Sequence, residues 1–180
     1  SVEAGPRDLV ILMDPGRAFG TGHHETTRLC LEQLESIVHG MDDMPGSLLD
    51  VGTGSGILAI GGALLGFDPV LGVDVDAEAV EVARENISLN KLTRRIELRK
   101  GSVGDVAGRF RVVVANIQTH PLVELAGPLI QRLEPAGRLL LSGILLEQEQ
   151  QVREVYEAGG VRFRSSERQG EWCLLLFERL

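Results

Sequence analysis

Cysteine is scarce in this sequence, with only Cys30 and Cys173 among 180 residues. The two lie far apart in amphipathic segments, so we expect neither a disulfide framework nor a clustered metal site, and both are predicted to be free thiols in the core. His23 and His24 are adjacent and lack a third partner at a recognised metal-ligand spacing. Hydrogen bonding within a loop is therefore the expected role of these histidines.

Positive charge is also in short supply. Lys and Arg number 18 against 26 Asp and Glu, which gives a formal net charge of -8. This charge argues against a general affinity for nucleic-acid phosphates, and a basic protein or a small molecule suits the chain better as a partner. We expect no direct nucleic-acid partner.

Long hydrophobic runs are absent. The most apolar stretch, residues 139–146, is interrupted by Ser142 and Gly143 and falls short of the ~20 residues that a membrane span needs. No signal peptide is visible at Ser1, so no membrane partner and a cytoplasmic location are expected. The length and the 43% hydrophobic content suit a single domain over residues 1–180, with an N-terminal segment and Gly-rich loop at 1–25 and an α/β core at 26–180.

Apolar runs alternate with helical patterns along the chain, which is typical of βαβ units and a parallel sheet. Strands are expected at residues 48–51, 70–73, 96–98, 110–115 and 138–141, the last of these after a turn at 135–137. An antiparallel pair is expected to follow at 161–168 and 172–177. Helices are expected at 26–38, with Thr26 as N-cap, and at 57–65, 77–89, 121–133 and 147–158. The predicted fold class is α/β, with a doubly wound, mostly parallel seven-stranded sheet and a C-terminal antiparallel strand pair.

The sharpest local signal lies between the first strand and its helix, where residues 50–57 read Asp-Val-Gly-Thr-Gly-Ser-Gly-Ile. A tight turn there favours backbone angles that glycine adopts cheaply, and the missing Cβ at Gly54 lets a ligand touch the main chain. The helix N-terminus then offers N–H donors to an anionic group, either the carboxylate of a methionine moiety or a pyrophosphate. The turn alone does not decide between these ligands.

Spacing bears on that choice. A dinucleotide fingerprint has Gly or Ala three residues after the second glycine, where this chain has Ile57. The G-x-G-x-G form therefore favours S-adenosylmethionine. Asp74 ends the second strand about 20 residues on, where a carboxylate can accept hydrogen bonds from ribose hydroxyls. Because both cofactors contain a ribose, Asp74 does not separate them.

Several separated motifs extend this pattern. They are DPGRAFGTGHHETT at 14–27, LDVGTGSG at 49–56, GVDVD at 72–76, VANI at 114–117, LSGI at 141–144 and GEW at 170–172. The first is the most diagnostic, because its A-F-G-T-G-x-H-x-T-T arrangement is long and uncommon outside one family. On these residues the chain resembles the ribosomal protein L11 methyltransferases, a branch of the class I S-adenosylmethionine-dependent enzymes with a Rossmann-like fold.

The resemblance implies a set of cofactor contacts. Thr27 and Asn116 would contact the cofactor, a loop led by Phe19 would close over its methionine end, and Ser102 and Val103 would border the adenine. The full set expected to bind S-adenosyl-L-methionine is Phe19, Gly20, Thr21, Gly22, Thr27, Gly52, Gly54, Gly56, Asp74, Val75, Ser102, Val103 and Asn116.

The resemblance also implies a protein substrate, such as ribosomal protein L11, methylated at lysine or N-terminal amines. Members of the family carry an N-terminal substrate-recognition domain, which this chain does not include. It is therefore expected to be either the catalytic part of a longer protein or a shortened relative. Residues 117–121 (Ile-Gln-Thr-His-Pro) depart from the usual family pattern, so altered substrate contacts are expected there.

Methyl transfer from a sulfonium to nitrogen is an in-line displacement, so the protein mainly aligns the amine and excludes water. A lysine amine with pKa ~10.4 costs about 4 to 5 kcal/mol to present uncharged at neutral pH. The sulfonium charge and desolvation would lower that pKa. Asn116 is the expected catalytic residue, orienting the amine without a dedicated general base. His120 is expected to be a solvated loop residue, and Trp172 is expected to pack in the core.

Three other functions share part of this pattern. A small-molecule methyltransferase would use the same cofactor motifs. A nicotinamide-dependent oxidoreductase would reuse the Gly-rich turn and Asp74, but it gives the loop at Phe19 no role. A non-catalytic module would keep the cofactor fold without turnover.

Overall fold

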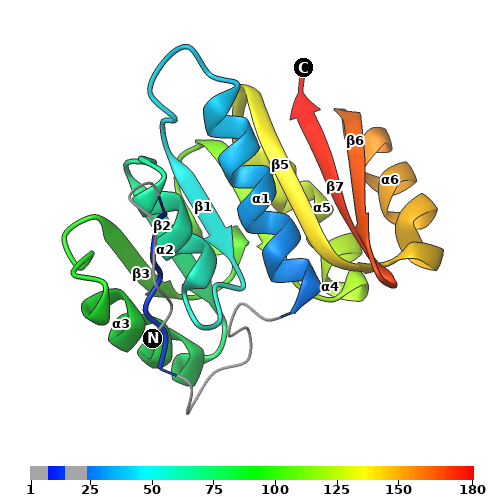
Figure 1. The fold of residues 1–180 in the computed structure, drawn as a ribbon. Helices are drawn as coiled ribbons and strands as arrows, with labels where there is room; N and C mark the ends of the chain where they lie inside the picture. The colour runs from blue at the N-terminus through cyan, green and yellow to red at the C-terminus, as the bar shows by residue number, and fades with distance from the viewer. Residues whose placement is uncertain (1–7, 15–23) are drawn as a thin grey trace.

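The computed structural model describes residues 8–14 and 24–180 of the chain, and Figure 1 shows a twisted sheet with helices on both faces. Within these residues the strand order is β3-β2-β1-β4-β5-β7-β6. The strands β1 to β5 pair in parallel, whereas β7 is antiparallel to β5 and β6. This confirms the predicted sheet. The strands are β1 (Leu48–Val51), β2 (Val70–Asp74), β3 (Ile96–Lys100), β4 (Phe110–Asn116), β5 (Leu133–Leu145), β6 (Val161–Gln169) and β7 (Trp172–Arg179).

The helices divide between the two faces of the sheet. Successive strand residues point to opposite faces, so Leu48 lies in one apolar cluster with α1, α2 and α3, and Leu49 lies in another with α4, α5 and α6. The helices are α1 (Glu25–His39), α2 (Ile57–Leu64), α3 (Ala77–Leu89), α4 (Thr119–Glu124), α5 (Ala126–Gln131) and α6 (Glu149–Ala158), with 3-10 turns η1 (Val103–Asp105) and η2 (Leu146–Gln148).

The strand order reverses between β1 and β4. From β1 the chain proceeds outward through β2 to β3, and then returns to β4 on the other side of β1 and continues to β5. Val51 pairs with both Val73 and Ala115, so β1, β2 and β4 end at the same edge. The loops after β1 and β4 lead to helices on opposite faces, an arrangement that opens a ligand crevice at the carboxyl ends of the strands.

Two predicted helices differ from those observed. The helix expected at residues 121–133 is divided into α4 and α5, with Leu125 between them. Pro128 explains the division, because proline lacks an N–H and is tolerated only in the first turn of a helix. The prediction of Thr26 as the N-cap of α1 is wrong. His24 is the cap, and its Nδ1 accepts the Thr26 N–H at 3.3 Å.

The fifth strand is longer than predicted. Residues 135–137 were expected to form a turn before it, but β5 spans Leu133–Leu145. Ala136 has a φ of +58°, and the pairing with β4 passes from Leu133 opposite Phe110 to Arg138 opposite Val112. The expected bend is therefore present as an irregularity within the strand rather than as its beginning.

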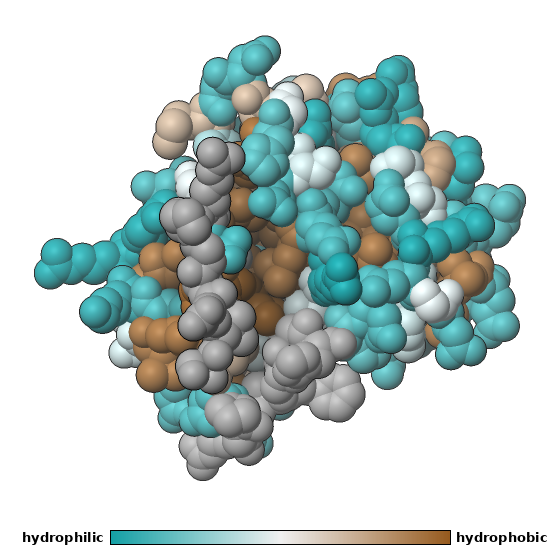
Figure 2. Space-filling view, in the orientation of Figure 1, coloured by the Kyte–Doolittle hydropathy of each residue, from teal (hydrophilic) through white to brown (hydrophobic). Residues whose placement is uncertain are grey.

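Figure 2 shows polar side chains over most of one face, with hydrophobic side chains gathered in a hollow near its centre. Among the helices formed by residues 8–14 and 24–180, none has the length and apolar character to cross a bilayer. Cys30 and Cys173 are buried and unpaired, as predicted. Burial raises the pKa of the Cys30 thiol to about 12 and that of the Cys173 thiol to about 11.

Candidate functional site

The turn between β1 and α2 has the geometry that its glycines predict. Gly52, Gly54 and Gly56 all have positive φ angles, of 71°, 53° and 81°. A Cβ at Gly52 would lie 2.4 Å from Ile117 Cγ2 in the loop after β4. The turn therefore needs glycine at this position both for its backbone angle and for its close approach to β4.

Asp74, at the end of β2, lies against this turn. Its Oδ2 accepts the Gly54 N–H at 2.9 Å, and its Oδ1 accepts the Asp76 N–H at 3.0 Å. The structure thus brings together two predicted site residues that are 20 positions apart. The carboxylate is half-buried, so a ligand at the turn would meet it at the edge of the sheet.

The other residues predicted near Asp74 differ in exposure. Val75 is 69% exposed, whereas the side chain of Val103 is buried in the core. The Gly101 N–H donates to the Asp74 carbonyl at 2.8 Å, which places Ser102 beside the end of β2. The main chain of residues 101–103 therefore borders the edge that Asp74 occupies.

Asp50 is a buried carboxylate beneath the same turn, and it is not among the site residues expected from the sequence. Its Oδ2 accepts the Thr53 hydroxyl at 2.6 Å and the Ala59 N–H at 3.1 Å. Its Oδ1 is buried without a hydrogen-bond partner within the described residues. Burial raises the pKa of Asp50 to about 6, the hydrogen bonds from Thr53 and Ala59 oppose this, and the charge of Asp74 adds to it. A buried oxygen without a donor among the described residues thus lies below the glycine turn.

Asn116, at the end of β4, is held by the first turn of α1. Its Nδ2 donates to Thr27 Oγ1 at 3.3 Å, and Thr27 is 2% exposed. Within the described residues the amide oxygen of Asn116 accepts no hydrogen bond. The nitrogen end of the side chain is therefore fixed, and the described residues leave the oxygen free to meet a ligand.

The strand beside Asn116 also fixes its position. Asn116 pairs with Ser142 in β5, and the Ser142 hydroxyl donates to the Thr26 carbonyl at 3.4 Å. A Cβ at Gly143 would lie 2.3 Å from the Ile117 carbonyl oxygen, and Gly143 has a φ of +83°. The loop after Asn116 therefore rests directly on the β5 backbone.

The remaining candidates lie around this edge. His24 caps α1, and its ring lies 5.1 Å from that of Trp172 in an edge-to-face contact, so the hydrogen-bonding hypothesis holds for His24. Trp172 is partly buried at the beginning of β7. His120 is exposed as expected, but it lies in α4 rather than in a loop, with Nε2 3.3 Å from Glu124 Oε1. Across residues 8–14 and 24–180, no group of three His, Cys, Asp or Glu residues could hold a metal ion.

Some predictions fall elsewhere in the chain. His23 and the loop residues Phe19, Gly20, Thr21 and Gly22 lie outside the described residues.

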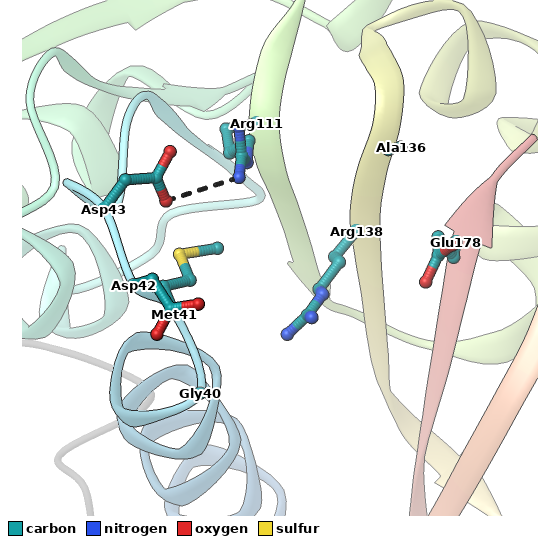
Figure 3. A pocket seen from close by; sticks show the side chains of 8 residues that line it. All are labelled: Gly40, Met41, Asp42, Asp43, Arg111, Ala136, Arg138 and Glu178. Carbon is teal, nitrogen blue, oxygen red and sulfur yellow. Dashed lines mark ion pairs between the residues drawn. The ribbon is translucent and has the colours of Figure 1, made fainter.

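A cavity of about 580 Å³ lies at the opposite, amino edge of β4 and β5. Figure 3 shows Arg111 pointing toward Asp43, 3.6 Å away, and Arg138 extending into this cavity. It contains none of the predicted site residues, and it is lined by Gly40, Met41, Asp42, Asp43, Arg111, Ala136, Arg138 and Glu178.

Comparison with known proteins identifies the family of this chain. A family model described as ribosomal protein L11 methyltransferase (PrmA) matches residues 1–179. The chain belongs to this family. A relative named ribosomal protein L11 methyltransferase, from Pelobacter propionicus, is 50% identical over 97% of this chain and 57% of its own length. The chain thus spans a little over half the length of the curated relatives that it matches.

Solved structures agree with this membership of the L11 methyltransferase family. A ribosomal protein L11 methylase from Lactobacillus delbrueckii subsp. bulgaricus is 34% identical, with a TM-score of 0.87 over 99% of this chain and 91% of that chain. A magnesium protoporphyrin IX methyltransferase from Synechocystis, solved with bound SAM, is 16% identical, with a TM-score of 0.67 over 86% of this chain and 81% of that chain. The second likeness shows the fold alone. The class I methyltransferase fold and the resemblance read from the motifs are confirmed.

Proposed function

We propose that this chain catalyses transfer of a methyl group from S-adenosylmethionine to lysine or N-terminal amines of a protein related to ribosomal protein L11. The observation that carries the proposal is the pairing of Asn116 with Thr27 at the edge where Asp74 meets the glycine turn. An amide oxygen that accepts no hydrogen bond within the described residues suits an amine acceptor, because it can accept one of the amine's N–H groups.

The residues of this edge fit the chemical groups of S-adenosylmethionine. Asp74 would accept hydrogen bonds from the ribose hydroxyls, and main-chain N–H groups of the glycine turn would face the carboxylate of the methionine moiety. Asp50 and Asp74 repel one another, and a ligand with ammonium and sulfonium charges would offset that repulsion. Asp50 Oδ1 has no partner within residues 8–14 and 24–180, which supports the presence of a cationic or hydrogen-bond-donating group nearby. The Synechocystis neighbour, whose structure contains SAM, supports the same choice.

The remaining contacts proposed for the cofactor are distributed between its methionine end and its nucleoside. Thr27, Gly52 and Asn116 would lie near its methionine end, and Val75, Ser102 and Val103 near its nucleoside. The residues from Phe19 to Gly22 complete the proposed set. When bound, the cofactor supplies an electrophilic methyl group on a sulfonium sulfur.

Asn116 would orient the attacking amine. With Nδ2 held by Thr27 Oγ1, its oxygen accepts an amine N–H and directs the nitrogen lone pair toward the methyl carbon. In the transfer, the amine lone pair would form the new N–C bond, the electrons of the old S–C bond would stay with sulfur, and the surplus proton on nitrogen would pass to water. Alignment and desolvation supply the rate enhancement, so no dedicated general base is required.

The proposed substrate is a protein, by analogy with the relatives that carry the name ribosomal protein L11 methyltransferase. The formal net charge of -8 supports a basic partner, because opposite charges accelerate encounter. Lysine-rich acceptor segments would be attracted to such a surface.

The test is incubation with radiolabelled S-adenosylmethionine and purified ribosomal protein L11, with electrophoresis of the products. We expect label in L11, and calorimetry should show binding of S-adenosylhomocysteine, the demethylated product.

Asp74→Ala should weaken that binding roughly tenfold or more, since two hydrogen bonds to a charged acceptor are worth about 1.5 to 3 kcal/mol. Asn116→Ala should lower kcat with a much smaller change in binding.

Four outcomes separate the parts of this proposal. Absence of binding to S-adenosylhomocysteine would reject the cofactor. Binding without label in L11 would reject the substrate, and label in a low-molecular-weight fraction of a cell extract would point to a small-molecule acceptor. Equal losses of binding and kcat in Asn116→Ala would make Asn116 a cofactor clamp instead of an orienting residue.

A further inference from the structure

A buried amide links the glycine turn to the segment that precedes α1. Asn86 lies in the interior of α3 and is 0% exposed. Asparagine is a poor residue for a helix interior, and a buried amide is costly unless its polar atoms are hydrogen-bonded. Both ends of Asn86 are bonded: Nδ2 donates to the Ser55 carbonyl at 2.9 Å, and Oδ1 accepts the Asp14 N–H at 3.1 Å. One side chain therefore joins two segments that lie on either side of it.

A second amide holds the same upstream segment. Asn90 follows Asn86 by one helical turn, on the same side of α3. Its Oδ1 accepts the Leu12 N–H at 2.9 Å, and its Nδ2 donates to the Leu12 carbonyl at 2.8 Å. Asn90 Nδ2 also donates to the Asn86 carbonyl at 2.8 Å. Leu12 is thus bound through both main-chain groups, much as a residue is bound by a neighbouring strand.

Apolar contacts add to the docking of residues 8–14. Ile11 and Met13 pack against the apolar cluster that includes α1, α2 and α3. Figure 1 shows this dark-blue segment crossing in front of α2 toward α3. The main-chain groups of Leu12 bond to Asn90, and the Asp14 N–H bonds to Asn86. Alternate residues of the segment therefore bind α3 and the apolar core.

The same helix also supports the glycine turn. A Cβ at Gly56 would lie 3.1 Å from Ala83 Cβ, one turn before Asn86. Gly54, on the other side of Ser55, is held by Asp74. Asn86 therefore fixes the Ser55 carbonyl in the middle of the turn whose N–H groups face the proposed cofactor.

We propose that Asn86 is a positioning residue that couples cofactor binding at the glycine turn to docking of residues 12–14 on α3. This inference rests on the proposed function, because it needs a ligand at the turn. Ligand binding holds the Ser55 carbonyl in one orientation. The Asn86 amide that donates to this carbonyl is then held as well, so the Asp14 N–H meets a fixed acceptor in Asn86 Oδ1. Since coupling is reciprocal, a docked segment in turn favours the ligand-binding form of the turn.

Hydrogen exchange at the Leu12 amide tests the coupling, because its acceptor is Asn90 and not the residue to be changed. In the unmodified chain, saturating S-adenosylhomocysteine should slow exchange at Leu12 about fivefold or more, the lower end of ordinary coupling between sites. In Asn86→Ala, saturating ligand should leave exchange at Leu12 unchanged, and the affinity for the ligand should fall by a similar factor. Ser88→Ala, an exposed change on the same helix, should behave as the unmodified chain.

A second variant protects the test against loss of the fold. Asn90→Ala keeps both side-chain bonds of Asn86 and releases Leu12, at the cost of the bond from Asn90 Nδ2 to the Asn86 carbonyl. It should therefore weaken S-adenosylhomocysteine binding measurably, by up to the factor seen in the exchange experiment. A Leu12 response to ligand that persists in Asn86→Ala, or unaltered affinity in Asn90→Ala, would overturn the coupling. An unmodified chain that fails to bind the ligand rejects the proposed function, whereas binding without any response at Leu12 rejects this inference alone.

Discussion

Asp50 is a residue whose charge opposes folding. Its carboxyl is fully buried, and its pKa is raised to about 6 from an ordinary value near 3.8. Between these two values the folded chain holds a proton that the unfolded chain has released, so stability falls as the pH rises from 4 to 6. Above pH 6 the loss is complete and amounts to about 3 kcal/mol by the usual conversion of a pKa difference. A buried charge of this kind suits a ligand-binding role better than a structural one.

Replacing Asp50 by Asn should remove that pH dependence. The amide oxygen can still accept the Thr53 hydroxyl and the Ala59 N–H, but it carries no charge. We expect the free energy of unfolding of Asp50→Asn, relative to the unmodified chain, to rise by about 2 to 3 kcal/mol between pH 4 and pH 7.5. Urea denaturation at the two pH values measures this difference. Parallel pH profiles for the two proteins would show that Asp50 is not the group responsible.

The residues of the candidate site differ in how well the sequence alone indicates them. Asp74 and Asn116 follow apolar runs at the ends of strands, and both lie at the predicted edge. Asp50 was missed because it is inside a strand, although an acid within the run Leu-Leu-Asp-Val is itself a signal of a special environment. The pairing of Thr27 with Asn116 joins residues 89 positions apart, and no local spacing indicates it.

At the scale of elements, the carboxyl end of β5 shapes the loop that carries Asn116 and Ile117. The pairing of β5 with β7 shifts between Leu141 and Ile144, and Gly143 lies within this irregularity. Its left-handed backbone and its contact with the Ile117 carbonyl leave no room for a side chain. The β5 backbone at Gly143 thus supports the loop after β4.

Gly143→Ala should therefore disturb both stability and turnover. The left-handed backbone alone costs a non-glycine residue about 1 to 2 kcal/mol, and the overlap with Ile117 adds to this by displacing the loop. Gly108→Ala is the matched control, since Gly108 has a φ of +84° and no atom within 4 Å of an added Cβ. We expect Gly108→Ala to lose stability with kcat unchanged, and Gly143→Ala to lose more stability and much of its kcat. Thermal unfolding and the L11 assay measure the two effects, and similar kcat values in both variants would contradict this role of Gly143.

Element boundaries were predicted less well than element types, for physical reasons. The division of α4 from α5 depends on Pro128, which lies within a run whose apolar periodicity continues across the break. The early part of β5 was assigned to a turn because Pro135 and Gly137 commonly mark one. Sheet pairing with Phe110 extends the strand through that segment, and such tertiary pairing is not visible in local composition.

At the scale of the whole molecule, the two apolar clusters share every central strand. Adjacent residues of β1 point into different clusters, so neither face can lose its packing without disturbing the other. The alternation of strand and helix was sufficient to predict this architecture, because parallel strands require crossovers that cover both faces. The docking of residues 8–14 on α3 was not predictable, since it depends on two amides whose partners are main-chain groups far along the chain.

A ligand at the carboxyl edge should stabilise this shared sheet as one unit. The proposed site draws on β1, β2, β4 and α1, so binding to the folded chain alone raises the free energy of unfolding by about 2.7 kcal/mol at a ligand concentration of 100 Kd. For a domain of this length that corresponds to a rise in Tm of roughly 5 to 10 °C. We expect S-adenosylhomocysteine to produce this rise in a single calorimetric transition, and NADH at the same concentration to leave Tm unchanged. A rise with NADH instead would favour the nicotinamide-dependent alternative, and two separate transitions would show that the faces unfold independently.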